Sequence, residues 1–446
     1  MSRNSLLFYA FAFLIAAAFS AEGRAQTREE KVREDRRRVE ADGFWIYNDL
    51  PKAFAEAERT GKPIVVGLRC IPCEECVKLD DELVDTDPAI RPLLEQFVCV
   101  RVVATNGLDL SLFQYDTDQS FAMFMLNADR TIYGRFGTRS HRTEWLGDVS
   151  LKGLAVALEK ALELHRNYPT NKQALAGKTG QPLEFASPEL FPSLKDKFTD
   201  SLNYEGEVVK SCIHCHQIGD ARRDFYRQKG QPIPEKLLYS YPHPKVVGLT
   251  MDPQKAATVK AVEPGSAADD AGIKAGDEIT SLAGQPLISV ADVQWVLHNT
   301  DPSGGQIAAS ILRESESIDV VLNLEDGWRR ADDISWRVSS WGLRRMSTGG
   351  LKLAELPANE RRQLKIADDH MALKVEHVGQ YGAHAAAKNA GFEKGDVIVQ
   401  FDGHRDLLRD GDVLAYGVTQ RKPGDKVPVT VLRNGSEKTL QLPMQE

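Results

Sequence analysis

A repeat in the second half of the chain constrains its fold more than any other feature. Residues 271–279 read AGIKAGDEI, and the pattern recurs as AGFEKGDVI at residues 390–398. Gly284 recurs in the same register as Gly403. A pattern that returns within one chain indicates two copies of one folding unit. The second half of the chain is therefore predicted to contain two similar modules.

The elements that flank the repeat are shared by the two copies. A helix of small residues precedes each copy, and a strand that ends in a hairpin follows it, marked by Arg313 in the first copy and Arg433 in the second. This arrangement is similar to bacterial PDZ domains, specifically those appended to periplasmic serine proteases. The resemblance predicts PDZ domain 1 at residues 244–326 and PDZ domain 2 at residues 338–446.

The PDZ resemblance implies how the two modules bind. PDZ domains take an extended peptide as an added strand and hold its terminal carboxylate with backbone amides of the preceding loop. By position, the loop residues are Val247, Gly248 and Leu249 in the first module and Gly349, Gly350 and Leu351 in the second. Protein C-termini or extended peptides are the expected partners. The alternative is a spacer without a ligand, because strand addition needs an open sheet edge.

No serine-protease signature accompanies these modules. The chain has no G-x-S-x-G nucleophile motif, and the other predicted domains leave no segment to hold a protease. We therefore predict that the protein is not a protease.

The first half of the chain has the element order of an α/β domain. Residues 61–63 read GKP and lead into an apolar strand at 64–68, and cysteines follow directly. The later elements are an extended stretch at 97–103, a strand pair at 121–126 and 131–136, and an amphipathic helix at 151–165. This order resembles the thioredoxin fold over residues 44–168.

Aligned on exported thioredoxin-like proteins, Cys73 and Cys76 take the place of the redox pair. The resemblance implies that Cys73, at the first turn of a helix, is the catalytic nucleophile and that Cys76 is the resolving thiol. Two alternatives stay open. Cys70, Cys73 and Cys76, with Cys99 or His141 as a fourth ligand, would suit copper, zinc or an iron–sulfur centre. A purely structural disulfide is the other alternative.

Residues 212–216 read CIHCH, which is the spacing of c-type haem attachment. Cys212 and Cys215 would bond to one porphyrin, and His216 would bind the haem iron from the proximal side. Residues 169–243 are accordingly predicted to be a short helical segment that binds covalent haem c. Candidates for the distal ligand are His243, Met251 and Met346. The alternative is a redox or structural C-x-x-C that is followed by a histidine by chance.

The N-terminus carries the pattern of an export signal. Arg3 precedes an apolar run at 6–19, and small residues follow it. We predict a signal peptide at 1–25, a charged linker at 26–43, and a periplasmic or otherwise exported protein without a membrane span after cleavage. An uncleaved anchor is the alternative. The formal net charge of −8 offers no basic excess for phosphates, so a nucleic-acid partner is not expected.

The predicted fold class is a multidomain α/β and β-rich protein with a thioredoxin-like domain, a short helical haem c segment and two PDZ domains. The predicted function is that of an exported redox protein, which transfers electrons or exchanges thiols and disulfides on a partner protein held by the PDZ domains. The alternative is a non-enzymatic periplasmic scaffold or adaptor, with a structural or metal-binding thioredoxin-like domain. Shared occurrence in one chain is the reason for linking these roles.

Overall fold

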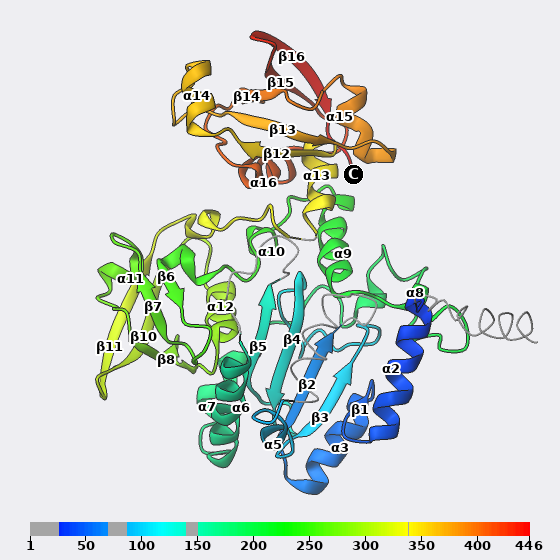
Figure 1. The fold of residues 1–446 in the computed structure, drawn as a ribbon, viewed down its shortest axis with the longest axis vertical. Helices are drawn as coiled ribbons and strands as arrows, with labels where there is room; N and C mark the ends of the chain where they lie inside the picture. Colours follow the sequence, from blue (N-terminus) through cyan, green and yellow to red (C-terminus); the bar gives the residue numbers. More distant parts are fainter. Residues whose placement is uncertain (1–25, 70–86, 140–149, 338) are drawn as a thin grey trace, which may run out of the picture.

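The computed structural model describes residues 26–69, 87–139, 150–337 and 339–446. Figure 1 shows an α/β domain and the first repeated module side by side, with the second module at one end of the long axis. The predicted signal peptide lies outside the described residues, as do Cys70, Cys73, Cys76 and His141. No helix in the described part of the chain combines the length and the apolar character needed to cross a membrane.

The N-terminal domain is built on a five-stranded sheet of order β1-β3-β2-β4-β5. The strands are β1 (Ile46–Tyr47), β2 (Ile64–Arg69), β3 (Val98–Val102), β4 (Gln119–Leu126) and β5 (Ile132–Arg139). Strands β1 and β2 run parallel to β3, whereas β4 runs antiparallel to both β2 and β5. The central strand β2 is buried along its whole length: the apolar run at 64–68 predicts this, and the buried Arg69 at its end pairs with Asp35 at 3.0 Å.

Helices cover both faces of this sheet. Helix α3 (Leu50–Thr60) packs on the face that holds Val66, while α5 (Arg91–Leu94) and α6 (Leu151–Arg166) pack on the face that holds Val65. Neighbouring residues of a strand point to opposite faces, so one strand serves two cores. The residues predicted as a charged linker form α2 (Arg28–Asp42), which begins with a capping box between Thr27 and Glu30.

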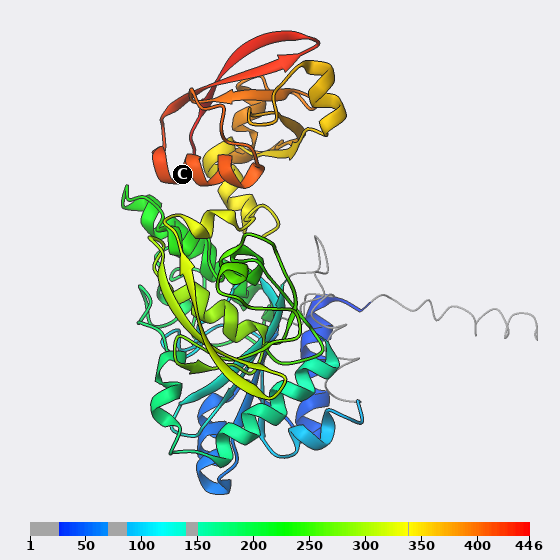
Figure 2. The same ribbon diagram turned by 90° about the vertical axis from the view of Figure 1, so that its left-hand side faces the viewer.

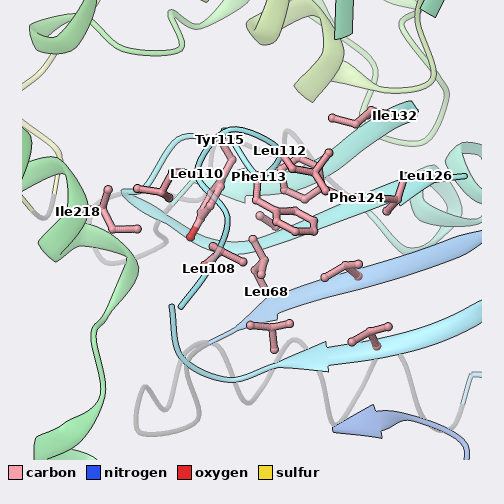
Figure 3. Close-up of a cluster of buried hydrophobic side chains, with 14 of the residues drawn as sticks. Leu68, Leu108, Leu110, Leu112, Phe113, Tyr115, Phe124, Leu126, Ile132 and Ile218 are labelled. Carbon is pink, nitrogen blue, oxygen red and sulfur yellow. The ribbon is translucent and has the colours of Figure 1, made fainter. Parts of the chain in front are cut away.

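The segment at 169–243 does not form a separate haem domain. Three of its helices have four residues each, α7 (Lys172–Leu175), α8 (Val208–Ser211) and α10 (Glu235–Leu238), and α9 (Cys215–Gln228) has 14. Figure 3 shows Ile218 of α9 beside Leu110 and Tyr115 of the N-terminal domain, within one apolar cluster. Ile213 belongs to the same cluster. The segment is helical in part, as predicted, but its apolar side chains lie in the core of the N-terminal domain.

The first module has two sheets and one long helix. Its strands are β6 (Leu249–Met251), β7 (Val259–Val262), β8 (Glu278–Leu282), β9 (Gln285–Pro286), β10 (Gly305–Arg313) and β11 (Glu316–Leu324). Strand β6 pairs with β7, and the other strands have the order β11-β10-β8-β9. Its helices are α11 (Ala267–Asp270) and α12 (Val290–Asn299).

The second module has one five-stranded sheet of order β12-β13-β14-β15-β16. The strands are β12 (Leu351–Glu355), β13 (Leu373–Val378), β14 (Val397–Phe401), β15 (Lys426–Arg433) and β16 (Ser436–Pro443). The helices are α13 (Ser340–Thr348), α14 (Ala358–Leu364), α15 (Ala386–Asn389) and α16 (Asp410–Gln420). The second module therefore follows the first in element order, as the repeat predicts.

Buried ion pairs join the modules to the N-terminal domain. Asp292 of α12 accepts a hydrogen bond of 3.1 Å from the backbone of Arg135 in β5 and pairs with Lys178 at 2.9 Å. Arg337, in the segment between the modules, pairs with Asp116 at 2.7 Å and with Asp118 at 3.4 Å in the loop before β4. Charges placed this deep are stable only when paired, so these contacts specify how the domains dock.

Candidate functional site

The predicted loop of the second module leads directly into an open sheet edge. Strand β12 pairs with β13 on one side, and its other edge faces α16. Gly349 and Gly350 precede it with φ angles of 60° and 92°, which glycine adopts without strain. A Cβ atom at Gly350 would lie 2.1 Å from the carbonyl oxygen of His384. Only glycine therefore fits this turn.

The loop of the first module has the same construction. Gly248 precedes β6 with a φ of 85°, and a Cβ atom there would lie 1.9 Å from the Oγ of Ser266. The carbonyl of Gly248 accepts a hydrogen bond of 2.8 Å from Glu263, and that of Gly350 accepts one of 3.0 Å from Gly379. The structure thus places the two predicted loops at equivalent positions.

Amides of both loops already have partners within the chain. The N–H of Gly248 donates to the carbonyl of Lys245 at 2.9 Å, and the N–H of Gly350 donates to that of Arg344 at 2.9 Å. Each bond caps the short helix that comes before the loop. In this state of the protein, these two amides cap a helix end and a peptide carboxylate would have to compete for them.

Helix α16 forms the wall opposite the open edge of β12. The backbone amide of Leu353 is directed at the carboxylate of Asp410, and Arg344 pairs with the same carboxylate at 2.5 Å. Burial raises the pKa of Asp410 above its usual value, although Arg344 opposes the change. Leu414 and Val418 follow Asp410 at four-residue steps, so the three side chains lie on the same side of α16. A peptide added to β12 would lie between the strand and these side chains.

In the first module, α12 presents polar side chains at the corresponding place. His298 accepts a hydrogen bond of 3.2 Å from the backbone N–H of Tyr241, and Gln294 donates to the carbonyl of Tyr241 at 3.3 Å. The rings of Tyr241 and His298 stack with centroids 4.0 Å apart. Burial and the nearby Lys236 lower the pKa of His298 well below its usual value, so the ring is neutral.

Sequence reasoning missed the wall residues of both helices. A usable signal exists, because an Asp-Val pair follows each repeated glycine at a similar distance, Asp292-Val293 in one copy and Asp412-Val413 in the other. Extending the repeat to these pairs would have located both helices. It would not have shown which of their side chains face the neighbouring strand.

The predicted haem residues lie at the start of α9. Cys212 has extended backbone, and its buried thiol donates to the carbonyl of Val208 at 3.2 Å. Burial raises the pKa of this thiol to about 11, with a further contribution from Glu29. Cys215, the first residue of α9, accepts a hydrogen bond of 3.0 Å from the hydroxyl of Tyr115. The two thiols therefore do not lie one turn apart on a helix.

The residues of this motif do not fit a covalent haem. Both thiols would have to face one porphyrin, but Cys212 points at a carbonyl inside the domain. Ile213, between the cysteines, is fully buried, and its carbonyl accepts hydrogen bonds from the backbone and hydroxyl of Thr105. His216 stacks on His214 with ring centroids 5.8 Å apart. The first two residues of the motif are thus buried in the N-terminal domain, while His214, Cys215 and His216 are partly exposed.

The three candidate distal ligands belong to other parts of the molecule. Met251 packs in the core of the first module, and Met346 packs between α13 and α16, in clusters that contain none of residues 212–216. His243 is buried and accepts a hydrogen bond of 3.2 Å from the backbone of Lys245. The two methionines thus pack in hydrophobic cores, and His243 caps the turn that follows it.

Three segments of the chain match known domain families. Residues 45–128 match a family described as thioredoxin-like, and residues 258–303 and 375–444 each match a family described as PDZ domain. The chain therefore contains a thioredoxin-like domain and two PDZ domains, as the sequence predicts.

Several curated relatives are periplasmic serine endoproteases. The chain is 35% identical over 307 residues to the periplasmic pH-dependent serine endoprotease DegQ of Escherichia coli (strain K12), covering 65% of this chain and 61% of DegQ. It is 33% identical over 151 residues to the periplasmic serine endoprotease DegP of Salmonella typhimurium, covering 34% of this chain and 27% of DegP. The chain thus spans less than two thirds of the length of these relatives.

Solved structures of similar proteins match smaller parts. The HtrA-type protease AlgW with a bound decapeptide covers 31% of this chain and 49% of its own, with 17% identity and a TM-score of 0.20. The serine endoprotease from Yersinia pestis covers 18% of this chain and 28% of its own, with 29% identity and a TM-score of 0.16.

Two predictions about function are wrong. Similarity to periplasmic serine endoproteases contradicts the predicted redox function, whether electron transfer or thiol–disulfide exchange, and it does not favour the non-enzymatic scaffold. It also contradicts the prediction that the protein is not a protease. The reason is that a missing G-x-S-x-G motif excludes one sequence pattern only. Serine triads are assembled on unrelated folds from residues that lie far apart in the chain.

Proposed function

We propose that this protein acts in the proteolysis of proteins outside the cytoplasm, and that its PDZ domains bind extended peptide segments of the substrates. The relatives are periplasmic serine endoproteases by name, which supports both the reaction and the compartment. The peptide class follows from the binding mode of PDZ domains, which add a strand to an exposed sheet edge.

The open edge of β12 is the observation that carries this proposal. The strand is the outermost of its sheet, and the N–H of Leu353 points away from β13 towards α16. An extended peptide that displaces the Asp410 carboxylate from this N–H could therefore hydrogen-bond to β12 without disturbing the rest of the sheet. The buried wall of α16 would contact every second side chain of such a peptide.

Proteolysis is tested with the full chain and an unfolded protein such as reduced, alkylated casein. We expect fragments to accumulate, and we expect a fluorophosphonate probe to label a serine that mass spectrometry then identifies. The same chain unfolded in guanidinium chloride is the control. Neither fragments nor labelling, with intact folded protein, would reject the proteolytic role.

Peptide binding is tested separately with a library of synthetic decapeptides that have free C-termini. Leu353→Pro removes the N–H on the open edge of β12, and edge strands tolerate proline. We expect the affinity to fall at least tenfold in this variant. Leu353→Val keeps the N–H and serves as the matched control. Equal affinity in the two variants would show that the peptide does not add to β12.

A further inference from the structure

We propose that α13 occupies the peptide position of the second module and must leave it before a peptide can bind. This inference rests on the peptide binding proposed above. Helix α13 ends at Thr348, directly before Gly349 and β12, and it lies next to α16 in both views (Figures 1 and 2). It approaches the loop in the same chain direction as a peptide whose C-terminus the loop would hold.

Apolar side chains of α13 pack against the α16 wall of the groove. Leu343 and Met346 pack in one buried cluster with Leu414 and Val418 of α16. These α16 side chains are the ones that a peptide on β12 would contact. The side chains of α13 therefore take the place that side chains of a bound peptide would need.

The two helices approach most closely at a glycine. A Cβ atom at Gly417 would lie 2.3 Å from the Cβ of Ser347. No side chain larger than hydrogen fits at this position while α13 stays in place. The absence of a side chain at 417 allows the backbones of α13 and α16 to come together.

Polar groups at the mouth of the groove are also satisfied by α13. Arg344 pairs with Asp410, with side chains that are only 4% and 8% exposed. The hydroxyl of Thr348 donates to the carbonyl of Leu351 at 3.1 Å. Removing α13 would leave the Asp410 carboxylate and the Leu351 carbonyl without these partners, and a peptide backbone or a basic side chain could then bind them.

The first module repeats this arrangement with a different segment. The residues that lead into β6 lie against α12, where the backbone N–H and carbonyl of Tyr241 contact His298 and Gln294. The incoming segment thus contacts the same helix in both modules. The two incoming segments have unrelated sequences. Coverage of this helix by the incoming segment therefore follows from the fold of the module.

The opposite side of α13 faces the rest of the molecule. Arg345 pairs with Asp224 of α9 at 3.6 Å, and a Cβ atom at Gly342 would lie 3.3 Å from Asp220 of the same helix. Helix α13 is therefore held between α16 and α9. A peptide that displaces α13 would also loosen the attachment of the second module to the body of the protein.

The test releases α13 and offers its place to a free peptide. Leu343→Asp puts a charge into the apolar contact from the α13 side and leaves the sheet and α16 unchanged. Leu364→Asp makes the same substitution at an exposed leucine of α14 in the same module and is the matched control. The measurements are amide hydrogen exchange of residues 340–348 and the affinity for a synthetic peptide of residues 339–350. Exchange of β13 to β16 shows whether the module stays folded.

We expect Leu343→Asp to speed exchange of α13 at least tenfold and to tighten peptide binding at least tenfold, whereas Leu364→Asp changes neither. Unchanged exchange of α13 would overturn the proposal. Faster exchange with equal affinity in variant and wild type would also overturn it, while leaving peptide binding intact. If α13 is released and neither this peptide nor the decapeptide library binds, the proposed peptide recognition fails, and the closure with it.

A second variant covers the case in which Leu343→Asp does not fold. Gly417→Val acts from the α16 side, because its side chain collides with Ser347. We expect it to speed exchange of α13 and also to block the free peptide, since it fills the same space. Thr419→Val, two residues further along α16, is its control. Slow exchange of α13 in folded Gly417→Val would contradict the proposed contact.

Discussion

The guanidinium group of Arg433 donates two hydrogen bonds of 2.7 Å to the carboxylate of Asp396. Arg313 binds Asp277 in the same way, with bonds of 2.8 and 2.7 Å. Both aspartates belong to the repeated motif, and both arginines mark the hairpins. Each arginine also donates to a glycine carbonyl of the motif at 2.8 Å. In each module, one arginine–aspartate ion pair thus joins the hairpin to the repeated motif, and we call this pair the clamp of the module.

The clamp of the first module predicts a pH dependence. Burial alone would raise the pKa of Asp277, but the hydrogen bonds from Arg313 lower it below its usual value. The ionised Asp277 carboxylate therefore stabilises the module above a pH of about 4, and this stabilisation is lost as the pH falls through the lowered pKa. We expect Asp277→Asn to destabilise the first module by about 1–3 kcal/mol at pH 7.

The effect of Asp277→Asn should shrink towards pH 2, because the wild-type carboxylate is then protonated. Urea unfolding followed by tryptophan fluorescence at pH 7, 4 and 2 measures this. Asp270→Asn, at an exposed position of the same module, is the control. A difference between wild type and Asp277→Asn that does not vary with pH would contradict the role of the ion pair.

A comparison of Gly350 with Gly403 separates the energetic cost of backbone strain from that of a steric collision. Gly350 has a φ of 92° and Gly403 one of 86°, but a Cβ atom meets a carbonyl oxygen at 2.1 Å in the first case and nothing within 4 Å in the second. We expect Gly403→Ala to cost about 1 kcal/mol from strain alone. Gly350→Ala should cost more than this and should weaken peptide binding. Equal unfolding free energies for the two variants would argue against the close approach.

Arg337 should be among the residues least tolerant of truncation. Its guanidinium is fully buried with Asp116 and Asp118, which raise its pKa against the opposing effect of burial. Arg337→Ala leaves two buried carboxylates without this cation, so we expect a loss of about 3–5 kcal/mol. Arg330→Ala, which breaks an exposed pair with Glu235, should change stability by under about 1 kcal/mol. Chemical denaturation of both variants provides the comparison.

The thiol of Cys212 should react slowly in the folded protein. With its pKa raised to about 11, the thiolate at pH 8 is on the order of 200-fold rarer than for an ordinary cysteine. We expect iodoacetamide to modify Cys212 at least this much more slowly in the native state than after unfolding. Peptide mass spectrometry resolves this site from the other cysteines. Rapid modification of native Cys212 would show that the thiol is accessible.

Local sequence patterns predicted a central strand and the two repeated modules of this protein correctly. The apolar run at 64–68 is the central strand β2, and the repeat at 271–279 and 390–398 marks two modules of one kind. Patterns of this sort are local, because strand burial and turn glycines depend on residues that are neighbours in the chain. The C-x-x-C-H motif is equally local, but the residues that surround it in the structure come from other parts of the chain.

Burial of Ile213 and the inward thiol of Cys212 depend on Thr105 and Val208, and no pattern within residues 212–216 contains that information. The contact of α13 with α16 joins Ser347 to Gly417, and the position of Arg337 depends on Asp116 and Asp118. Which segment covers a groove is settled by packing between distant parts of the chain, and packing depends on shape in three dimensions. Local patterns in the chain were therefore enough to predict the two modules and their loops, whereas the segments that pack against those loops can be seen only in the folded structure.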